Sequence, residues 1–357
     1  PTERGPYNYE PFEGSNVSAG LNPDGTLLNP SDRWAGIQRP LTTTDFEATN
    51  IEYIQFWVMD PFNEDSENES GGRLFINLGN VSEDILNDSQ LAFENGLPSA
   101  NNTDLETDTS TWGIYPDPTT FNVVNAFDNS TNDYSRQDVG LDGLNSEEER
   151  VFFNAWLSSL EDGLEPDALA RYQNDPSADD YRYRRDPQAQ ANGENLLERY
   201  QFFNRYEGNS NTGLPDGYAI AATTIPNTED INEDLTLGTI ESYYQYEIPM
   251  TPADLTPENI GKGYLADILE ASPTNLPDDL PLKPVKWYQF RIPVREYQKA
   301  VNGISDFRSI RFMRMFMTGW SEPVTLRFGR IELVRGEWRR YEQSLAGFQE
   351  LEVVVPY

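Results

Sequence analysis

Apolar and polar residues alternate along several short runs of this chain, with the two-residue period of a half-buried β-strand. A pair of such runs near the N-terminus, 45–60 and 74–81, has a counterpart near the C-terminus, 306–319 and 324–331. With two residues left out of the later copy, the matching positions are Asp45 with Asp306, Phe46 with Phe307, Ile51 with Ile310, Tyr53 with Phe312, Ile54 with Met313, Leu78 with Phe328, and Gly79 with Gly329. Because the same alternation buries the same face twice, the repeat predicts two related β-sandwich modules of jelly-roll-like architecture.

The alternation shifts by one residue at a glycine in both copies of the repeat. The apolar positions pass over Gly79 to Val81 in the first copy and over Gly329 to Ile331 in the second. An extra residue in one strand re-aims the side chains that follow it, and glycine is common where this happens. The pattern therefore predicts one β-bulge in each module.

The middle of the chain changes to the helical period. Helices are predicted from Ser146 onward, over Pro166–Tyr172 and over Glu194–Tyr206, with Ser146 as the cap of the first helix. Strands are predicted near Trp112 and Phe121 and, after residue 218, over Thr239–Ile248, Trp287–Val294, Ile310–Thr318, Thr325–Arg335 and Leu351–Val355. The chain is thus predicted to be mainly β with a helical insertion (α+β). The predicted domains are a first β-sandwich module at 1–137, an acidic loop and helical insertion at 138–210, and a second β-sandwich module at 211–357.

Composition narrows the range of chemistry. The 357 residues include no histidine and no cysteine, which excludes disulfides, Ser-His-Asp triads, cysteine nucleophiles and the usual transition-metal sites. Glycoside hydrolysis by paired carboxylates stays open, but no spacing among the 60 Asp and Glu residues singles out an acid and a nucleophile. We therefore expect a protein that is not an enzyme.

The formal charge of -34 makes nucleic acid an unfavourable partner, because the surface repels phosphates, and makes cations such as Ca²⁺ favourable ones. The acidity can also serve only to keep the protein soluble. No run approaches the roughly 18 apolar residues of a spanning helix. We expect a soluble segment that does not itself span a membrane.

One acidic stretch, DVGLDGLNSEEE at 138–149, has the ligand spacing of an EF-hand loop. In that spacing the metal ligands are Asp138, Asp142, the backbone carbonyl of Leu144, Ser146 and Glu149. The third position is Gly140, so one carboxylate is missing, and the preceding residues do not resemble an entering helix. The sequence predicts a bound Ca²⁺ here, and the alternative is an acidic loop that only caps the helix after it.

Aromatic residues raise a function of a different class. Trp34 and Trp112 lie in turn-rich segments and could line a sugar-binding platform, whereas Trp57 and Trp320 lie at strand ends and are expected to be packing residues. Jelly-roll modules with aromatic faces and calcium often bind sugars. The alternative function is therefore a calcium-dependent glycan-binding β-sandwich module.

Long motifs along nearly the whole chain resemble the SprA/Sov family, the giant outer-membrane translocons of the Bacteroidota type 9 secretion system, also known as gliding motility protein SprA. The motifs are RWAGIQR (33–39), IEYIQFWVMDPF (51–62), LFINLGNVSEDILND (74–88), FENGLP (93–98), VNAFDN (124–129), QDVGLDGL (137–144), NTEDINED (227–234), YYQYEIP (243–249) and RFMRMFMTGW (311–320). Their number and order make a chance match improbable.

The resemblance implies a role in protein transport. The family's translocon is a very large β-barrel that exports folded cargo, and this chain resembles only a part of it outside the lipid. The resemblance implies a non-enzymatic extracellular cap at the cell outer membrane, with a periplasmic position as the alternative. Such a segment would provide scaffold and partner surfaces for protein export and gliding motility. Its partners would be the rest of the translocon barrel, accessory outer-membrane proteins and secreted cargo proteins.

Overall fold

The computed structural model describes residues 20–62, 70–99, 103–117, 127, 136–209, 228–272 and 284–336. The strands are β1 (Trp34–Pro40), β2 (Ile51–Met59), β3 (Gly72–Asn80), β4 (Thr107–Thr109), β5 (Ile114–Pro116), β6 (Ser242–Met250), β7 (Leu265–Ala271), β8 (Val285–Pro293), β9 (Lys299–Ala300), β10 (Phe312–Thr318) and β11 (Phe328–Arg335). The α-helices are α2 (Ser146–Phe152), α3 (Asn154–Leu160), α4 (Pro166–Asn174), α5 (Pro187–Ala191) and α6 (Leu196–Tyr200), and the 3₁₀ helices are η1 (Pro30–Asp32), η2 (Glu94–Gly96) and η3 (Pro257–Asn259).

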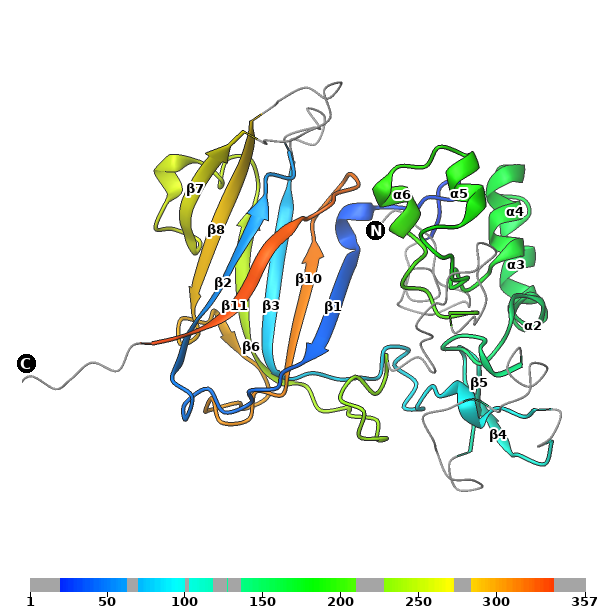
Figure 1. The fold of residues 1–357 in the computed structure, drawn as a ribbon. Coiled ribbons are helices and arrows are strands. Elements are labelled where there is room, and N and C mark those ends of the chain that lie inside the picture. The colour runs from blue at the N-terminus through cyan, green and yellow to red at the C-terminus, as the bar shows by residue number, and fades with distance from the viewer. Residues whose placement is uncertain are drawn as a thin grey trace, which may run out of the picture.

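Two antiparallel sheets form a β-sandwich (Figure 1). The five-stranded sheet has the order β1-β10-β3-β6-β9, and the four-stranded sheet has the order β11-β2-β8-β7. Phe56 of β2 and Ile76 of β3, one from each sheet, are fully buried in the same apolar cluster. The Tyr246 hydroxyl donates a hydrogen bond to the Val294 carbonyl, 2.5 Å away, so even the polar end of this buried ring is satisfied.

The mainly β fold with a helical insertion is confirmed, but the two copies of the repeat do not form separate sandwiches. β2 pairs with β11, and β3 pairs with β10, so each copy supplies a neighbouring strand to the other. The first copy runs from the four-stranded to the five-stranded sheet, and the second copy runs the opposite way. Two residues at the same position of the repeat are in direct contact, because the Phe46 N–H donates a hydrogen bond to the Phe307 carbonyl at 2.8 Å. The repeated pattern thus reflects two copies that face one shared core.

One predicted bulge is confirmed and the other is wrong. The pairing of β11 with β2 shifts register between Phe328 and Ile331, around Gly329. At Gly79 the pairing with β6 is continuous, with Tyr243 as the partner. Here glycine is required for another reason, because its φ is +150° and a Cβ would lie 2.3 Å from the Ser242 carbonyl oxygen.

The described residues between 81 and 241 form an inserted lobe beside the sandwich (Figure 1). The lobe has two small apolar clusters instead of one large one. The first contains Leu27, Phe153, Trp156, Leu157 and Tyr172, and the second contains Leu86, Ala92, Trp112, Tyr115 and Leu141. Leu27 comes from the N-terminal segment that precedes β1, so this segment ties the lobe to the sandwich. Among the helices that the structure describes, none is both long and apolar enough to cross a membrane.

The helices of the lobe differ in detail from the prediction. The first predicted helix is two helices, α2 and α3, which meet at Phe153. Its cap is Asn145 rather than Ser146, because the Asn145 side chain accepts from the N–H groups of Glu147 and Glu148 in a capping box. The second helix is confirmed as α4, and the third is shorter than predicted. The predicted strands at Phe121 and at 351–355 lie outside the described residues.

Candidate metal centre

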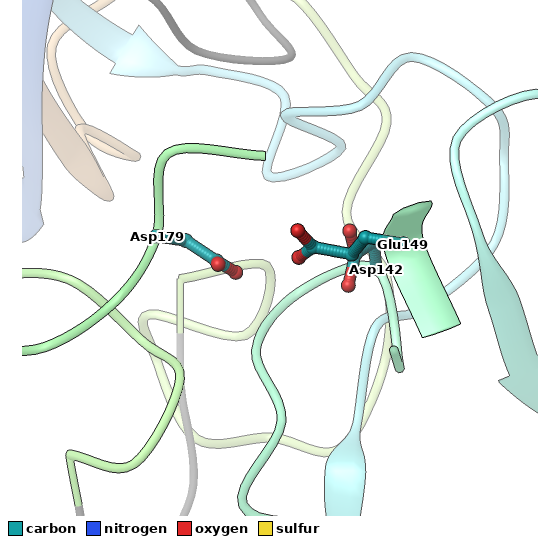
Figure 2. Close-up of side chains that lie close together, drawn as sticks. All are labelled: Asp142, Glu149 and Asp179. Carbon is teal, nitrogen blue, oxygen red and sulfur yellow. The ribbon is translucent and has the colours of Figure 1, made fainter. Parts of the chain in front are cut away.

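Three buried carboxylates meet inside the inserted lobe, and we call Asp142, Glu149 and Asp179 the carboxylate cluster. One carboxylate oxygen from each lies within 4.8 Å of the others. The side chains come from the loop before α2, from α2 itself and from the segment after α4, and Figure 2 shows the carboxyl group of Asp179 pointing toward those of Asp142 and Glu149. The residues are only 3%, 0% and 5% exposed, respectively.

The loop that carries Asp142 is held against β5. The Ile114 N–H donates to the Asp142 carbonyl at 2.8 Å, and the Leu144 N–H donates to Asp142 Oδ1 at 3.0 Å. A Cβ at Gly113 would lie 2.0 Å from the Asp142 carbonyl oxygen, so only glycine allows the strand to approach this closely. The close packing fixes the direction of the Asp142 side chain.

A glycine in the same loop makes room for Asp179. Gly140 has φ +94°, and a Cβ on it would lie 2.1 Å from Asp179 Oδ2. The Asp179 backbone is fixed in turn, because its carbonyl accepts from the N–H groups of Tyr206 and Glu207 at 3.0 and 2.9 Å. Gly140 weakens the EF-hand pattern because it supplies no carboxylate. The same lack of a side chain leaves room for the Asp179 carboxylate to enter from outside the loop.

Hydrogen bonds satisfy only some of the oxygens in the carboxylate cluster. The Ser177 hydroxyl donates to Asp142 Oδ2 at 2.5 Å, and the Ser177 N–H donates to Glu149 Oε2 at 3.2 Å. Among the described residues, no donor reaches the buried atoms Glu149 Oε1 and Asp179 Oδ1, and the side chain of Glu149 lies within hydrogen-bond reach of the carboxyl group of Asp142. A buried acceptor without a partner costs roughly 1–3 kcal/mol, and more when it is charged.

Charge makes the arrangement more costly still. Burial raises the pKa of Asp179 well above its usual value, and repulsion from Asp142 and Glu149 raises it further. Burial and then the charge of Asp142 likewise raise the pKa of Glu149. Burial also raises the pKa of Asp142, although the hydrogen bond from Ser177 opposes this. Nearby Glu207 has its pKa raised to about 7, mainly by burial. A buried set of carboxylates such as this one is stable only when protons or a cation neutralise its negative charge.

A further carboxylate extends this acidic region. Glu94 of η2 is 1% exposed, and its Oε1 accepts a hydrogen bond from the Gly140 N–H. Its Oε2 is buried without a partner among the described residues. Burial, and next the charge of Asp138, hold the pKa of Glu94 well above its usual value. Glu94 therefore places a further buried carboxyl group against the same loop.

The structure brings two of the predicted metal ligands together, Asp142 and Glu149, and adds Asp179 to them. Asp138 and Leu144 are buried in the same loop, and the Asp138 carbonyl accepts from the Gly208 N–H at 3.1 Å. The Ser146 hydroxyl donates to Glu207 Oε2 at 3.0 Å. Binding of one Ca²⁺ by the full EF-hand series stays a prediction.

The sequence interpretation missed Asp179 and Glu94. Neither lies in the 138–149 stretch, and each reaches the loop only through contacts between distant segments. The acidic and serine-containing run that holds Asp175, Ser177 and Asp179 was the only available signal for Asp179. It gives no indication of which other segment it approaches.

The two tryptophans predicted to form a sugar platform, Trp34 and Trp112, differ in their exposure to solvent. Trp112 is buried in the second small cluster of the lobe, so its interpretation as a surface residue is wrong. Trp34 is 56% exposed at the start of β1. Trp320 is buried in the sandwich core, which confirms its predicted packing role.

The chain matches a known family over more than half of its length. The family model described as motility related/secretion protein, SprA_N, matches residues 155–355, which is more than half of the 357-residue chain. The match begins in α3 and includes β6 to β11, so it covers parts of both the lobe and the sandwich. No curated protein matches the chain.

Proposed function

Because the chain belongs to the SprA_N family of motility related/secretion proteins, as a fragment of the SprA/Sov type, we propose that it is a non-enzymatic segment of a type 9 secretion translocon. In this role it supplies scaffold and partner surfaces for protein export and gliding motility. The family match over residues 155–355 is the observation that carries the proposal.

The character of the acidic residues supports a role without catalysis. The carboxylate cluster combines raised pKa values with a position in the interior, where Glu149 is 0% exposed. Carboxylates that act on a sugar must touch their substrate. Groups that solvent cannot reach are suited to holding the lobe together, and they are unsuited to hydrolysis of a polymer.

The proposed location is the extracellular face of the outer membrane, and the proposed partners are the rest of the translocon, its accessory outer-membrane proteins and secreted cargo. The net charge of -34 supports protein partners over nucleic acid, because an acidic surface repels phosphates. It also favours partner surfaces rich in Lys and Arg, since complementary charge speeds association.

An in-frame deletion of this segment from the parent protein tests the proposal. Type 9 cargo in the medium and gliding on a surface are measured, together with the amount of truncated protein in the outer membrane. We expect export and gliding to fall while the truncated protein is still present. Normal export and gliding by the truncated protein would overturn the proposal.

Glycan binding stays the alternative function. It is now supported by Trp34 alone, because Trp34 is exposed whereas Trp112 is buried. A glycan array probed with the chain and with Trp34→Ala separates the two functions. Sugar binding that is lost in Trp34→Ala favours the alternative, and the absence of binding favours the scaffold role.

A further inference from the structure

We propose that Asp142, Glu149 and Asp179 bind one Ca²⁺ ion, which joins three segments of the inserted lobe. The inference is independent of the export role. It concerns what holds the lobe together, and it assigns a ligand, Asp179, that lies outside the EF-hand spacing.

The spacing of the three carboxylates fits a calcium ion. Oxygen ligands lie about 2.3–2.6 Å from Ca²⁺, so two ligands on opposite sides of the ion are about 4.6–5.2 Å apart. The oxygens of Asp142, Glu149 and Asp179 lie within 4.8 Å of one another. They are therefore close enough to be ligands of one ion.

The unpartnered oxygens are the second observation that points to an ion. Glu149 Oε1 and Asp179 Oδ1 have no donor among the described residues, because the hydrogen-bonding neighbour of Glu149 is another carboxyl group, that of Asp142, and both side chains are more than nine-tenths buried. The lobe satisfies a buried carboxylate elsewhere, because Glu229 accepts N–H bonds from Ile85, Leu86 and Ala92 at 2.9 to 3.1 Å. A bound cation explains why the carboxylate cluster lacks comparable donors.

The charges around Asp179 also indicate that a cation binds here. The groups that act most strongly on Asp179 are carboxylates, namely Asp142, Glu149, Asp175 and Glu207. Arg205 lies beside this group, but it is paired with Asp175 at 3.0 Å. A divalent cation among Asp142, Glu149 and Asp179 cancels two of the three negative charges that would otherwise repel one another in a dry interior.

The ligand chemistry selects calcium among the common divalent ions. The three ligands are carboxylates, and the chain has no histidine or cysteine to attract zinc or copper. Magnesium needs shorter bonds of about 2.0–2.1 Å in a strict octahedron and tends to keep several waters. Asp142 and Asp179 are almost fully buried, and Ca²⁺ accepts bidentate carboxylates in such a site more readily.

An ion here adds a link among three segments that hydrogen bonds already hold close together. Asp142 belongs to the loop packed on β5, Glu149 to α2, and Asp179 to the segment that bonds Tyr206 and Glu207. Ser177 lies in the same segment as Asp179, and its two hydrogen bonds already connect that segment to Asp142 and Glu149. The ion adds a direct link from Asp179 to the same two residues at the centre of the lobe.

Calorimetric titration of the 357-residue chain with CaCl₂, after removal of ions with EDTA, tests the site. We expect one saturable site at one equivalent above the weak background of exposed carboxylates. Glu149→Gln and Asp179→Asn should each lower the affinity of this site at least about tenfold, because ligand charge sets calcium affinity. The matched control is Glu147→Gln, which removes the same charge from an exposed residue of α2 and should leave the affinity unchanged.

Melting curves in EDTA show whether the variants fold. Both ligand variants should melt at or above the temperature of the unaltered chain, because the amide is always neutral whereas the buried acid that it replaces must first take up a proton. If a variant does not fold, the other variant and the unaltered chain still decide. The proposal is overturned if the unaltered chain shows only weak multi-site binding, or if Glu149→Gln and Asp179→Asn bind Ca²⁺ as well as Glu147→Gln does.

Discussion

The sandwich and the inserted lobe bury different kinds of groups. In the sandwich, one apolar cluster spans both sheets, and side chains such as Phe56, Ile76 and Ile292 are fully buried. In the lobe, short helices and a two-stranded sheet enclose two small apolar clusters and several carboxylates. Burial of apolar area is stabilising wherever it occurs, whereas burial of charge stabilises only when partners are supplied. The sandwich is therefore expected to be stable by itself, and the lobe to depend on what neutralises its carboxylates.

The largest expected effect is a loss of packing in the sandwich. Phe56→Ala removes a 0% exposed ring that lies 5.3 Å from the Phe290 ring and 5.7 Å from the Phe328 ring, centroid to centroid. We expect a loss of about 3–5 kcal/mol in the free energy of unfolding, measured by denaturant titration. The loss should be the same in EDTA and in Ca²⁺. A loss that depends on calcium would contradict the separation of the two regions. Ile37→Ala, at a position 70% exposed, is the control and should change stability by less than about 0.5 kcal/mol.

The next largest effect is the response of the lobe to calcium. An ion that binds only the folded state at about 100 times its Kd stabilises that state by roughly 2.7 kcal/mol. Thermal unfolding followed in EDTA and in excess Ca²⁺ should show this gain in the unaltered chain and in Glu147→Gln, but not in Glu149→Gln. Mg²⁺ should give a smaller gain than Ca²⁺. Equal melting curves in EDTA and Ca²⁺ would contradict the prediction.

Gly140→Ala should act on the same site without removing a charge. Its φ of +94° is strained for any other residue, and the new Cβ would displace the Asp179 carboxylate. We expect a loss of about 1–3 kcal/mol in stability together with weaker calcium binding. Gly193→Ala is the matched control, because Gly193 also has a positive φ, +70°, but a Cβ there meets nothing within 4 Å. If both variants bind Ca²⁺ equally well, Gly140 does not make room for a ligand.

The smallest effect concerns Glu229, whose carboxylate is satisfied by backbone N–H groups. Glu229→Gln places an amide NH₂ group where a carboxyl oxygen accepts a hydrogen bond from a backbone N–H. We therefore expect the free energy of unfolding to fall by about 1 kcal/mol at pH 5. Burial raises the pKa of Glu229 to about 7, so its contribution to stability is full below pH 4.5 and is lost as the pH rises through 7. The difference between the two proteins in excess Ca²⁺ should therefore shrink from pH 5 to pH 8. A difference that grows with pH would show that the folded state prefers the ionised Glu229.

The sandwich could be predicted well where the signal is local. Alternation places Ile54, Phe56 and Val58 of β2 on the buried face, and all three are 0% exposed. Alternation specifies which face of a strand is buried, but it does not specify the neighbouring strand. The pairing of β2 with β11 brings together residues from opposite ends of the chain, and the repeat was therefore interpreted as two sandwiches.

The carboxylate cluster could be predicted only in part, for a similar reason. Asp142 and Glu149 lie in a recognisable spacing within one loop and helix, whereas Asp179 arrives through tertiary packing. In the sequence, Gly140 stands where the EF-hand pattern expects a ligand. In the structure, the Asp179 carboxylate occupies the space that a side chain at Gly140 would fill. A local motif can indicate the type of ion, but the fold determines which distant side chain completes the site.

Hydrogen exchange in EDTA and in Ca²⁺ tests most directly whether calcium holds the lobe and not the sandwich. The informative amides are those of Leu144, Ser177 and Glu207 in the lobe and those of the central strands β3 and β2 in the sandwich. Calcium is expected to slow exchange in the lobe while leaving exchange in the two strands unchanged. Exchange that is unchanged everywhere, or that slows equally in both regions, would contradict a calcium-dependent lobe beside an independent apolar sandwich.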